Sequence, residues 1–154
     1  MLSALSLMHQ NKFNIFFNIS KNVGVGQPND PLDLLLVQLG YYCMGINPLS
    51  GIPPESKAIY AQVKPGSPYG GRADEPLSRA IAEQERRRGL KQDGHVSRMA
   101  NQLSYVGARG QEAYLLLALC NNIYDMTKAE WPRIDKSTLC PSGLRAEIQR
   151  LLQN

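Results

Sequence analysis

A segment dense in proline and glycine divides the chain, and it limits the fold more than any other feature. Residues 45–71 contain five prolines and five glycines in 27 residues. Both residue types disfavour helix interiors, so we expect no regular helix here and at most a short strand at Ala58–Val63. We therefore expect a long ordered loop. Loops of this length in a compact domain are either functional or insertions.

The stretch before this loop has the signals of a helix. Asp30 can cap it, Pro31 suits its first position, and Asp33 falls in its first turn. The apolar residues that follow have helical spacing and are expected to face a core: Leu32, Leu35, Leu36 and Leu39. Gly40 or Gly45 is expected to end this helix.

A second helix is expected after the loop, from Asp74 to Gly89, with Pro76 in its first turn. Its inner face is expected to consist of Leu77, Ala80, Ile81 and Gln84. The Asp93-Gly94 dipeptide that follows is typical of a turn.

The rest of the chain is also mainly helical by its pattern. A third helix is expected from Val96 to Gly107, a fourth over 111–124, and a last one capped by Ser142, while aromatic and β-branched residues at 13–20 favour a strand. The chain is thus predicted to be mainly α. The predicted core of the first three helices comprises Leu35, Leu36, Leu39, Leu77, Ile81, Val96, Met99 and Leu103.

Charge is unevenly distributed along the chain. The formal net charge is +4, and residues 72–109 hold eight Arg/Lys against five Asp/Glu, which accounts for most of the excess. Such a surface attracts anions without choosing among them. Nucleic-acid binders usually carry denser basic stripes with interleaved aromatic residues, so we expect no nucleic-acid partner.

The N-terminal residues 1–17 are apolar but interrupted by polar residues, and they lack a charged start and a cleavage site. We therefore expect no signal peptide. No stretch reaches the roughly 18 apolar residues of a membrane-spanning helix, so no membrane span is expected. The predicted location is the bacterial cytoplasm at synthesis, with delivery to the periplasm by a secretion system as an option.

The three cysteines, Cys43, Cys120 and Cys140, form no CxxC pair. Their odd number and apolar surroundings argue against a disulfide framework and a zinc site. Cys43 and Cys120 are interpreted as core residues in a reducing compartment, and a Cys120–Cys140 bond is left open.

Groups for catalysis form no recognisable cluster in the sequence. His9 and His95 are far apart, and no metal-binding motif is present. Glu83 and Glu85 lie two apart on a helix and so do not share a face. We therefore expect no metal, no cofactor and no enzymatic activity.

Two stretches resemble parts of one known family. Asn22–Gln38, NVGVGQPNDPLDLLLVQ, resembles the opening of peptidoglycan-binding-like modules, in the form found in proteins associated with bacterial type VI secretion. Leu77–Val96, LSRAIAEQERRRGLKQDGHV, resembles the family's second half through Ala80-Ile81, Gln84, Gly89-Leu90 and Asp93-Gly94. The chain departs from the pattern at Glu83, where the family usually has phenylalanine, and in the loop before the second helix.

The resemblance covers roughly residues 20–105. It implies a peptidoglycan-binding-like three-helix unit with a long inserted loop and two C-terminal helices. Residues 1–107 would form the domain, with 45–71 as its insertion, and 108–154 would form a helical extension packed on it.

The resemblance further implies a non-enzymatic binding module of the bacterial cell envelope that recognises peptidoglycan or a secretion-associated partner. The alternatives are an adaptor or immunity-type module of a type VI effector system, whose partner is an effector, immunity or secretion component, and a small cell-wall hydrolase. The positive charge of the second helix and the aromatic residues of the loop predict the binding face. Its expected residues are Tyr60, Tyr69, Arg72, Arg79, Arg86, Arg87, Asp93 and His95.

Overall fold

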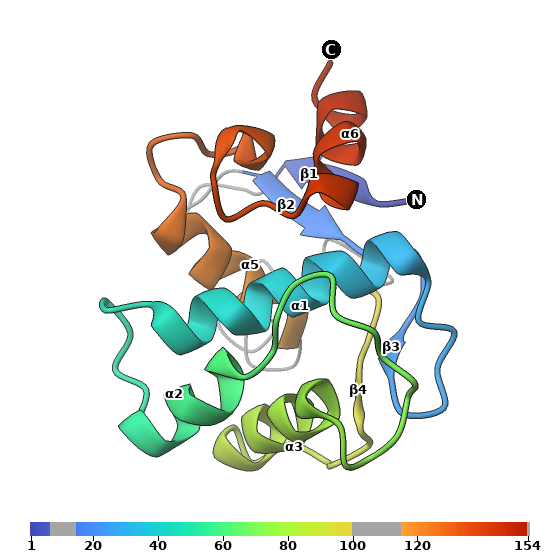
Figure 1. Ribbon diagram of the computed structural model, residues 1–154, viewed down its shortest axis with the longest axis vertical. Helices are drawn as coiled ribbons and strands as arrows, with labels where there is room; N and C mark the ends of the chain where they lie inside the picture. Colours follow the sequence, from blue (N-terminus) through green and yellow to red (C-terminus); the bar gives the residue numbers. More distant parts are fainter. Residues whose placement is uncertain (7–14, 100–114, 154) are drawn as a thin grey trace.

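A computed structural model describes residues 1–6, 15–99 and 115–153. In these ranges the protein is mainly helical, as predicted, with five α-helices and two small two-stranded sheets (Figure 1). The elements are β1 (Ser3–Ser6), β2 (Ile15–Asn18), β3 (Val23–Gly24), α1 (Pro31–Ile46), α2 (Pro54–Ala61), α3 (Pro76–Arg87), β4 (His95–Val96), α5 (Leu115–Met126), a 3-10 turn (Ile134–Lys136) and α6 (Ser142–Leu151). None of the helices in these ranges has the length and apolar character needed to cross a membrane.

Helix α1 crosses the middle of the molecule, with α2 and α3 on one side and α6 and the β1–β2 sheet on the other, while α5 passes behind it and packs against it (Figure 1). It does not end at Gly40 or Gly45, as predicted, but continues to Ile46. Both glycines allow a neighbouring helix to approach closely. A Cβ atom on Gly40 would lie 2.6 Å from Leu119 Cβ in α5, and one on Gly45 would collide with the backbone of Ala61 in α2.

The start of α1 is held by a different acid from the predicted one. Asp30 occupies the N-cap position but makes no side-chain capping bond, so that prediction is wrong. Asp33 is fully buried, and its carboxylate accepts hydrogen bonds from Ser20 N at 2.8 Å, Ser20 Oγ at 2.7 Å and Lys21 N at 3.0 Å. Asp33 therefore fixes the chain after β2 to the first turn of α1.

The prediction that 45–71 holds no helix is also wrong, because α2 lies within it. Pro53 and Pro54 occupy the N-cap and first helical positions, where a missing N–H costs nothing. The rest of the Pro54–Ala61 helix contains neither proline nor glycine. The strand expected at Ala58–Val63 is absent, because α2 occupies most of that stretch.

Helix α3 matches its prediction closely. It runs from Pro76 to Arg87, Gly89 follows in a left-handed conformation with φ of +65°, and the predicted inner face is buried. The third predicted helix is wrong at its start, because His95–Val96 forms strand β4, which pairs antiparallel with Val23–Gly24 of β3. Residues 97–99 are not helical either, and the rest of that predicted helix, residues 100–107, lies outside the described residues.

The other predicted elements are partly confirmed. The strand expected over 13–20 appears as β2, paired antiparallel with β1, and the described part of the helix expected over 111–124 is α5. Helix α6 begins at Ser142 itself, with Pro141 at the N-cap and no side-chain capping bond, so capping by Ser142 is wrong.

The predicted core is largely confirmed. Six of its members are buried: Leu36, Leu39, Leu77, Ile81, Val96 and Met99. Leu35 is partly buried, and Leu103 lies outside the described residues.

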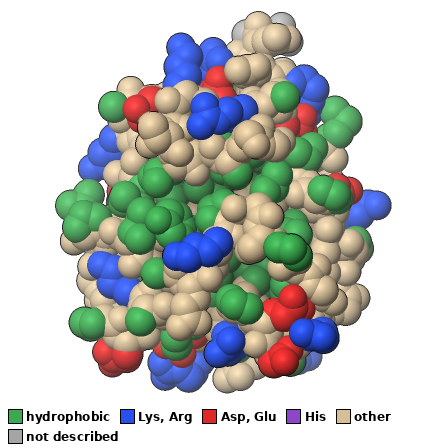
Figure 2. Space-filling model, viewed as in Figure 1, with side chains coloured by type: hydrophobic (Ala, Val, Ile, Leu, Met, Phe, Trp, Pro, Cys, Tyr) green, Lys and Arg blue, Asp and Glu red, His purple; other side chains and the backbone are tan. Residues whose placement is uncertain are grey.

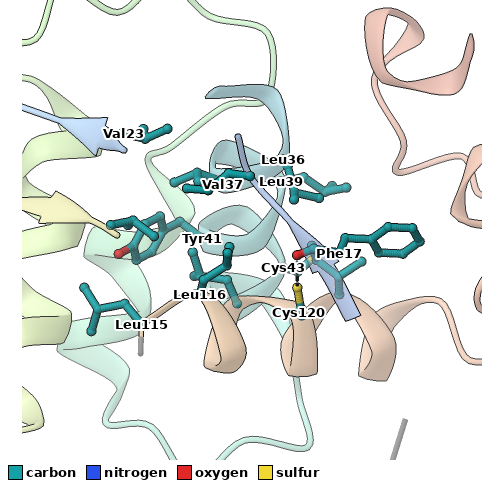
Figure 3. Close-up of a cluster of buried hydrophobic side chains, with 14 of the residues drawn as sticks. Phe17, Val23, Leu36, Val37, Leu39, Tyr41, Cys43, Leu115, Leu116 and Cys120 are labelled. Carbon is teal, nitrogen blue, oxygen red and sulfur yellow. Dashed lines mark hydrogen bonds between the residues drawn. The ribbon is translucent and has the colours of Figure 1, made fainter. Parts of the chain in front are cut away.

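The cysteines are free thiols in this fold. Cys43 of α1 and Cys120 of α5 lie in one apolar cluster, and the Cys120 thiol donates to the Phe17 carbonyl over 3.3 Å (Figure 3). Burial raises the pKa of both thiols to about 12, so they remain protonated core groups.

Candidate functional site

Helices α2 and α3 border a groove that contains two of the predicted arginines. The groove has a volume of about 380 Å³. Its lining, which defines the α2–α3 groove below, consists of Ile59, Gln62, Arg79, Ala82, Glu83, Arg86 and Gln92. It therefore combines charged groups, two amides and two apolar side chains.

The four predicted arginines have different surroundings. Arg86 forms a two-point ion pair with Glu83, through Nε to Oε1 at 2.8 Å and Nη2 to Oε2 at 2.6 Å. Arg87 Nη1 donates to Tyr60 Oη over 3.2 Å, and Arg72 lies 3.6 Å from Asp74 on the open surface. Arg79 is exposed, and its guanidinium has no carboxylate partner among the described residues. It is the predicted arginine most available to a ligand.

Glu83 is fixed between the two helices. Its side chain is only 11% exposed, and its Oε2 accepts a hydrogen bond from Ser56 Oγ of α2 at 2.6 Å in addition to the Arg86 contacts. The hydrogen bonds from Arg86 and Ser56 lower the Glu83 pKa to about 2. Glu83, where the resembled family usually has phenylalanine, thus places a negative charge in the groove near neutral pH.

The two predicted tyrosines do not lie in this groove. Tyr60 is fully buried and stacks on Tyr41 with ring centroids 5.8 Å apart, so the expectation that it offers a flat exposed surface is wrong. Tyr69 is half-buried, shares a 2.7 Å hydrogen bond with Ser78 Oγ, and borders a different pocket. Tyr60 lies in the segment that was expected to form a loop, so the sequence did not reveal that it belongs to helix α2.

Asp93 and His95 lie beside a second, smaller pocket of about 190 Å³ after α3. This turn pocket is lined by Glu85, Leu90, Lys91, Asp93, His95, Ser97 and Leu115. His95 Nδ1 is 3.5 Å from Asp93 Oδ1. The structure therefore does not bring the predicted site residues together. Arg79 and Arg86 line the α2–α3 groove, Asp93 and His95 line the turn pocket, and Tyr69 borders a third pocket, while Tyr60, Arg72 and Arg87 line none of the three.

Glu85 anchors the turn pocket, and sequence reasoning missed it. Its side chain is buried, and its carboxyl oxygens accept from the backbone N–H groups of Asp93 and Gly94, each at 3.2 Å. A signal was present, because Glu85 follows Leu77 and Ile81 at four-residue intervals on the buried stripe of α3. Glu85 had been considered only as a possible catalytic partner of Glu83, so its place on the buried stripe was missed.

The pKa values of Glu85 and Asp93 are shifted in opposite directions. Burial, followed by the hydrogen bond with Asp93, raises the pKa of Glu85 to about 7. Burial acts in the opposite direction at Asp93, but the bonds from Glu85 and from the His95 N–H hold the Asp93 pKa below its usual value. The raised pKa makes Glu85 the carboxyl of the pair that holds a proton more readily, and the lowered pKa makes Asp93 the one that is more readily ionised.

The turn itself is built by contact between the two stretches that carry the family resemblance. Val23–Gly24 pairs with His95–Val96, and Val25 N donates to the Gly94 carbonyl over 3.1 Å. Asn29 closes the other side, since its side chain accepts from Gly24 N at 2.8 Å and donates to the Gly24 carbonyl at 3.0 Å. These glycines and the asparagine thus have structural roles.

No group of three or more His, Cys, Asp or Glu side chains within the described ranges is arranged to hold a metal ion.

The face of the molecule in Figure 2 shows Lys and Arg side chains scattered among apolar and neutral groups. They do not gather there into one continuous basic stripe.

We expect Glu85→Gln to flatten the pH dependence of stability between pH 4.5 and 7. A folded pKa above the ordinary value of 4.5 means that the stabilising, protonated form is fully present below pH 4.5 and is lost as the pH rises through 7. The parent should therefore lose about 1–3 kcal/mol of unfolding free energy over this range relative to the variant. Urea unfolding at several pH values measures the difference.

Glu83→Gln is the matched control two residues away. The Glu83 pKa is lowered to about 2, so its contribution is present above pH 4.5 and is lost only as the pH falls below that value. Parallel stability curves for the parent and Glu85→Gln from pH 4.5 to 8 would mean that the fold does not raise the pKa of Glu85.

Comparison with known proteins adds no identity to this geometry. No protein-family model, no curated protein and no solved structure matches the chain.

Proposed function

We propose that the protein is a non-enzymatic binding module of the bacterial cell envelope, and that its α2–α3 groove binds carboxylate-bearing peptide stems of peptidoglycan. The resemblance of Asn22–Gln38 and Leu77–Val96 to peptidoglycan-binding-like modules motivates the ligand class. The groove supplies an arginine for the carboxylate, two glutamine amides for the peptide backbone and apolar surface for small side chains.

The observation that carries the proposal is the free guanidinium of Arg79. Unlike Arg86, it has no described carboxylate partner, although it lies in a groove large enough for a short peptide. A guanidinium presents a planar set of donors that fits a carboxylate with two hydrogen bonds. Gln62 and Gln92 add amide groups that can pair with a peptide backbone.

The apolar part of the groove suits the same ligand. Ile59 of α2 and Ala82 of α3 contribute small apolar surfaces beside Arg79. Short stem peptides combine a terminal carboxylate, backbone amides and small side chains, so each group has a counterpart in the groove. Delivery by a secretion system would bring the module to the wall.

The test is co-sedimentation with purified sacculi. We expect Arg79→Gln to weaken binding about five- to tenfold, because one charge-assisted hydrogen-bonded contact is removed. Arg72→Gln is the control, since Arg72 is exposed, carries the same charge and lies outside the groove. Equal sedimentation of both variants and the parent would place the site elsewhere.

Single substitution of Arg79 is sharper than removal of several arginines at once. Arg86 holds Glu83, and Arg87 donates to buried Tyr60, so changing either one also disturbs the contact between α2 and α3. If the parent does not sediment but co-purifies with an effector or secretion component, the adaptor function is favoured instead.

A small cell-wall hydrolase is the second candidate, and the turn pocket is the observation that favours it. Glu85 and Asp93 have pKa values shifted in opposite directions beside His95, an arrangement that can donate and accept protons. Both Glu85 oxygens, however, already accept backbone N–H groups of the turn. Release of soluble fragments from sacculi by the parent, abolished in Asp93→Asn, would favour this function over simple binding.

A further inference from the structure

We infer that Glu83 makes the α2–α3 groove selective for ligands that carry a single carboxylate, and that it excludes polyanions. The inference rests on the proposed function for its ligand class. It concerns how many negative charges a ligand of the groove can carry, which the net charge of the chain does not indicate.

Glu83 cancels one of the two positive charges of the groove. Arg79 and Arg86 contribute two positive charges and Glu83 one negative charge, so the lining carries a net charge of +1. Both nitrogen contacts of Arg86 are directed at Glu83, at 2.8 and 2.6 Å. Arg79 is then the single cation left for a ligand.

Helix spacing alone would allow Glu83 to pair with Arg79 instead. The two residues are four apart on α3, a distance at which side chains meet. The Ser56 hydroxyl of α2 donates to Glu83 Oε2 at 2.6 Å and, with Arg86, holds the carboxylate away from that pairing. Ser56 is therefore a positioning residue, buried between the helices, that keeps Arg79 free.

A second negative charge on a ligand would meet repulsion in this groove. One carboxylate bound at Arg79 neutralises the net charge of the lining. A second would lie near the Glu83 carboxylate, whose neighbouring cations Arg86 and Arg87 already interact with Glu83 and Tyr60. Glu55 of α2 adds to this field, since with Glu83 it raises the pKa of Arg86. Like charges about 5 Å apart at a partly screened surface weaken binding about five- to tenfold.

The experiment compares three peptides of equal length by titration calorimetry or NMR: acetyl-D-alanyl-D-alanine amide, acetyl-D-alanyl-D-alanine and acetyl-D-alanyl-D-glutamate. They carry none, one and two carboxylates. We expect the parent to bind the second about five- to tenfold more tightly than either of the others. Tighter binding of the third peptide than of the second would overturn the inference without any mutation.

A polyanion assay tests the inference even if none of the peptides binds. Single-stranded oligothymidylate at low ionic strength is expected to bind Glu83→Gln at least fivefold more tightly than the parent, and the gain should vanish in Arg79→Gln/Glu83→Gln. Ser56→Ala retains the negative charge and should exclude the polyanion as the parent does. Circular dichroism of each variant verifies folding.

The outcomes separate the two proposals. If peptide binding depends on Arg79 but Glu83→Gln gains no affinity for the dicarboxylate or the oligonucleotide, the selectivity inference fails and the proposed function stands. If no peptide binds and Arg79→Gln has no effect on sacculi, the proposed function fails. A gain of polyanion binding by Glu83→Gln would then still support the exclusion of polyanions.

Discussion

Ile81→Asp is expected to lower the free energy of unfolding by about 3–5 kcal/mol, a large part of the roughly 5–15 kcal/mol that stabilises a typical domain. Ile81 lies on the inner stripe of α3 and has no exposed surface. A carboxylate there must be ionised without a partner or must take up a proton, and either state is unfavourable in an apolar site. Urea or thermal unfolding followed by circular dichroism measures the loss.

Ile81→Val is the control for this substitution. It removes one methylene group without adding a polar atom, so it should cost about 0.5–1.5 kcal/mol. An unchanged melting temperature for Ile81→Asp would show that α3 does not present this face to the core. Because both arginines of the groove are on α3, such a result would also remove the basis for their placement.

The sequence predicted α3 well because every signal needed for it is local. Pro76 marks the start, Gly89 marks the end, and Leu77, Ala80, Ile81 and Gln84 repeat at helical spacing. The same reasoning failed for 45–71, because the number of prolines and glycines was weighed without their positions. Two prolines at the beginning of a helix favour it, and the remaining ones lie outside α2.

Gly40 and Gly45 could not be interpreted correctly from local pattern alone. A glycine in a helical stretch can end the helix or admit a neighbour, and the choice depends on residues distant in sequence. Here Leu119 occupies the space beside Gly40, and Ala61 the space beside Gly45. Val96 is similar, because its apolar character suits either a helix or a strand until its partner Val23 is known.

The candidate site likewise combines features that local sequence reveals with features that depend on contacts between distant residues. The charge of α3 was evident in the sequence, and it drew attention to Arg79 and Arg86, which line the α2–α3 groove. Which arginine is free was not evident, since that depends on Ser56 and Glu83 from different helices meeting at 2.6 Å. The turn pocket could not be predicted either. It forms because the chain reverses after α3 and brings the Asp93 N–H back to the Glu85 carboxyl group.

The reversal depends on close backbone approach at Gly24, and Gly24→Ala is expected to destabilise the protein by about 2–4 kcal/mol. Gly24 has φ of +147°, which alanine rarely adopts, and an added Cβ would lie 2.6 Å from His95 Cα and collide with the Gly94 carbonyl oxygen. Strands β3 and β4 would have to separate, which would loosen the turn that carries Asp93. Hydrogen exchange at Val25, whose N–H bonds to Gly94, should accelerate.

Gly26→Ala separates the collision from the backbone strain. Gly26 also has a positive φ, of +70°, but an added Cβ would meet nothing within 4 Å. Strain alone should therefore cost about 1 kcal/mol there and leave exchange at Val25 near the parent rate. Equal losses for the two variants would contradict the close approach of β3 to β4. The larger loss at Gly24 is expected because the Gly94 carbonyl is backbone, which cannot rotate away as a side chain can.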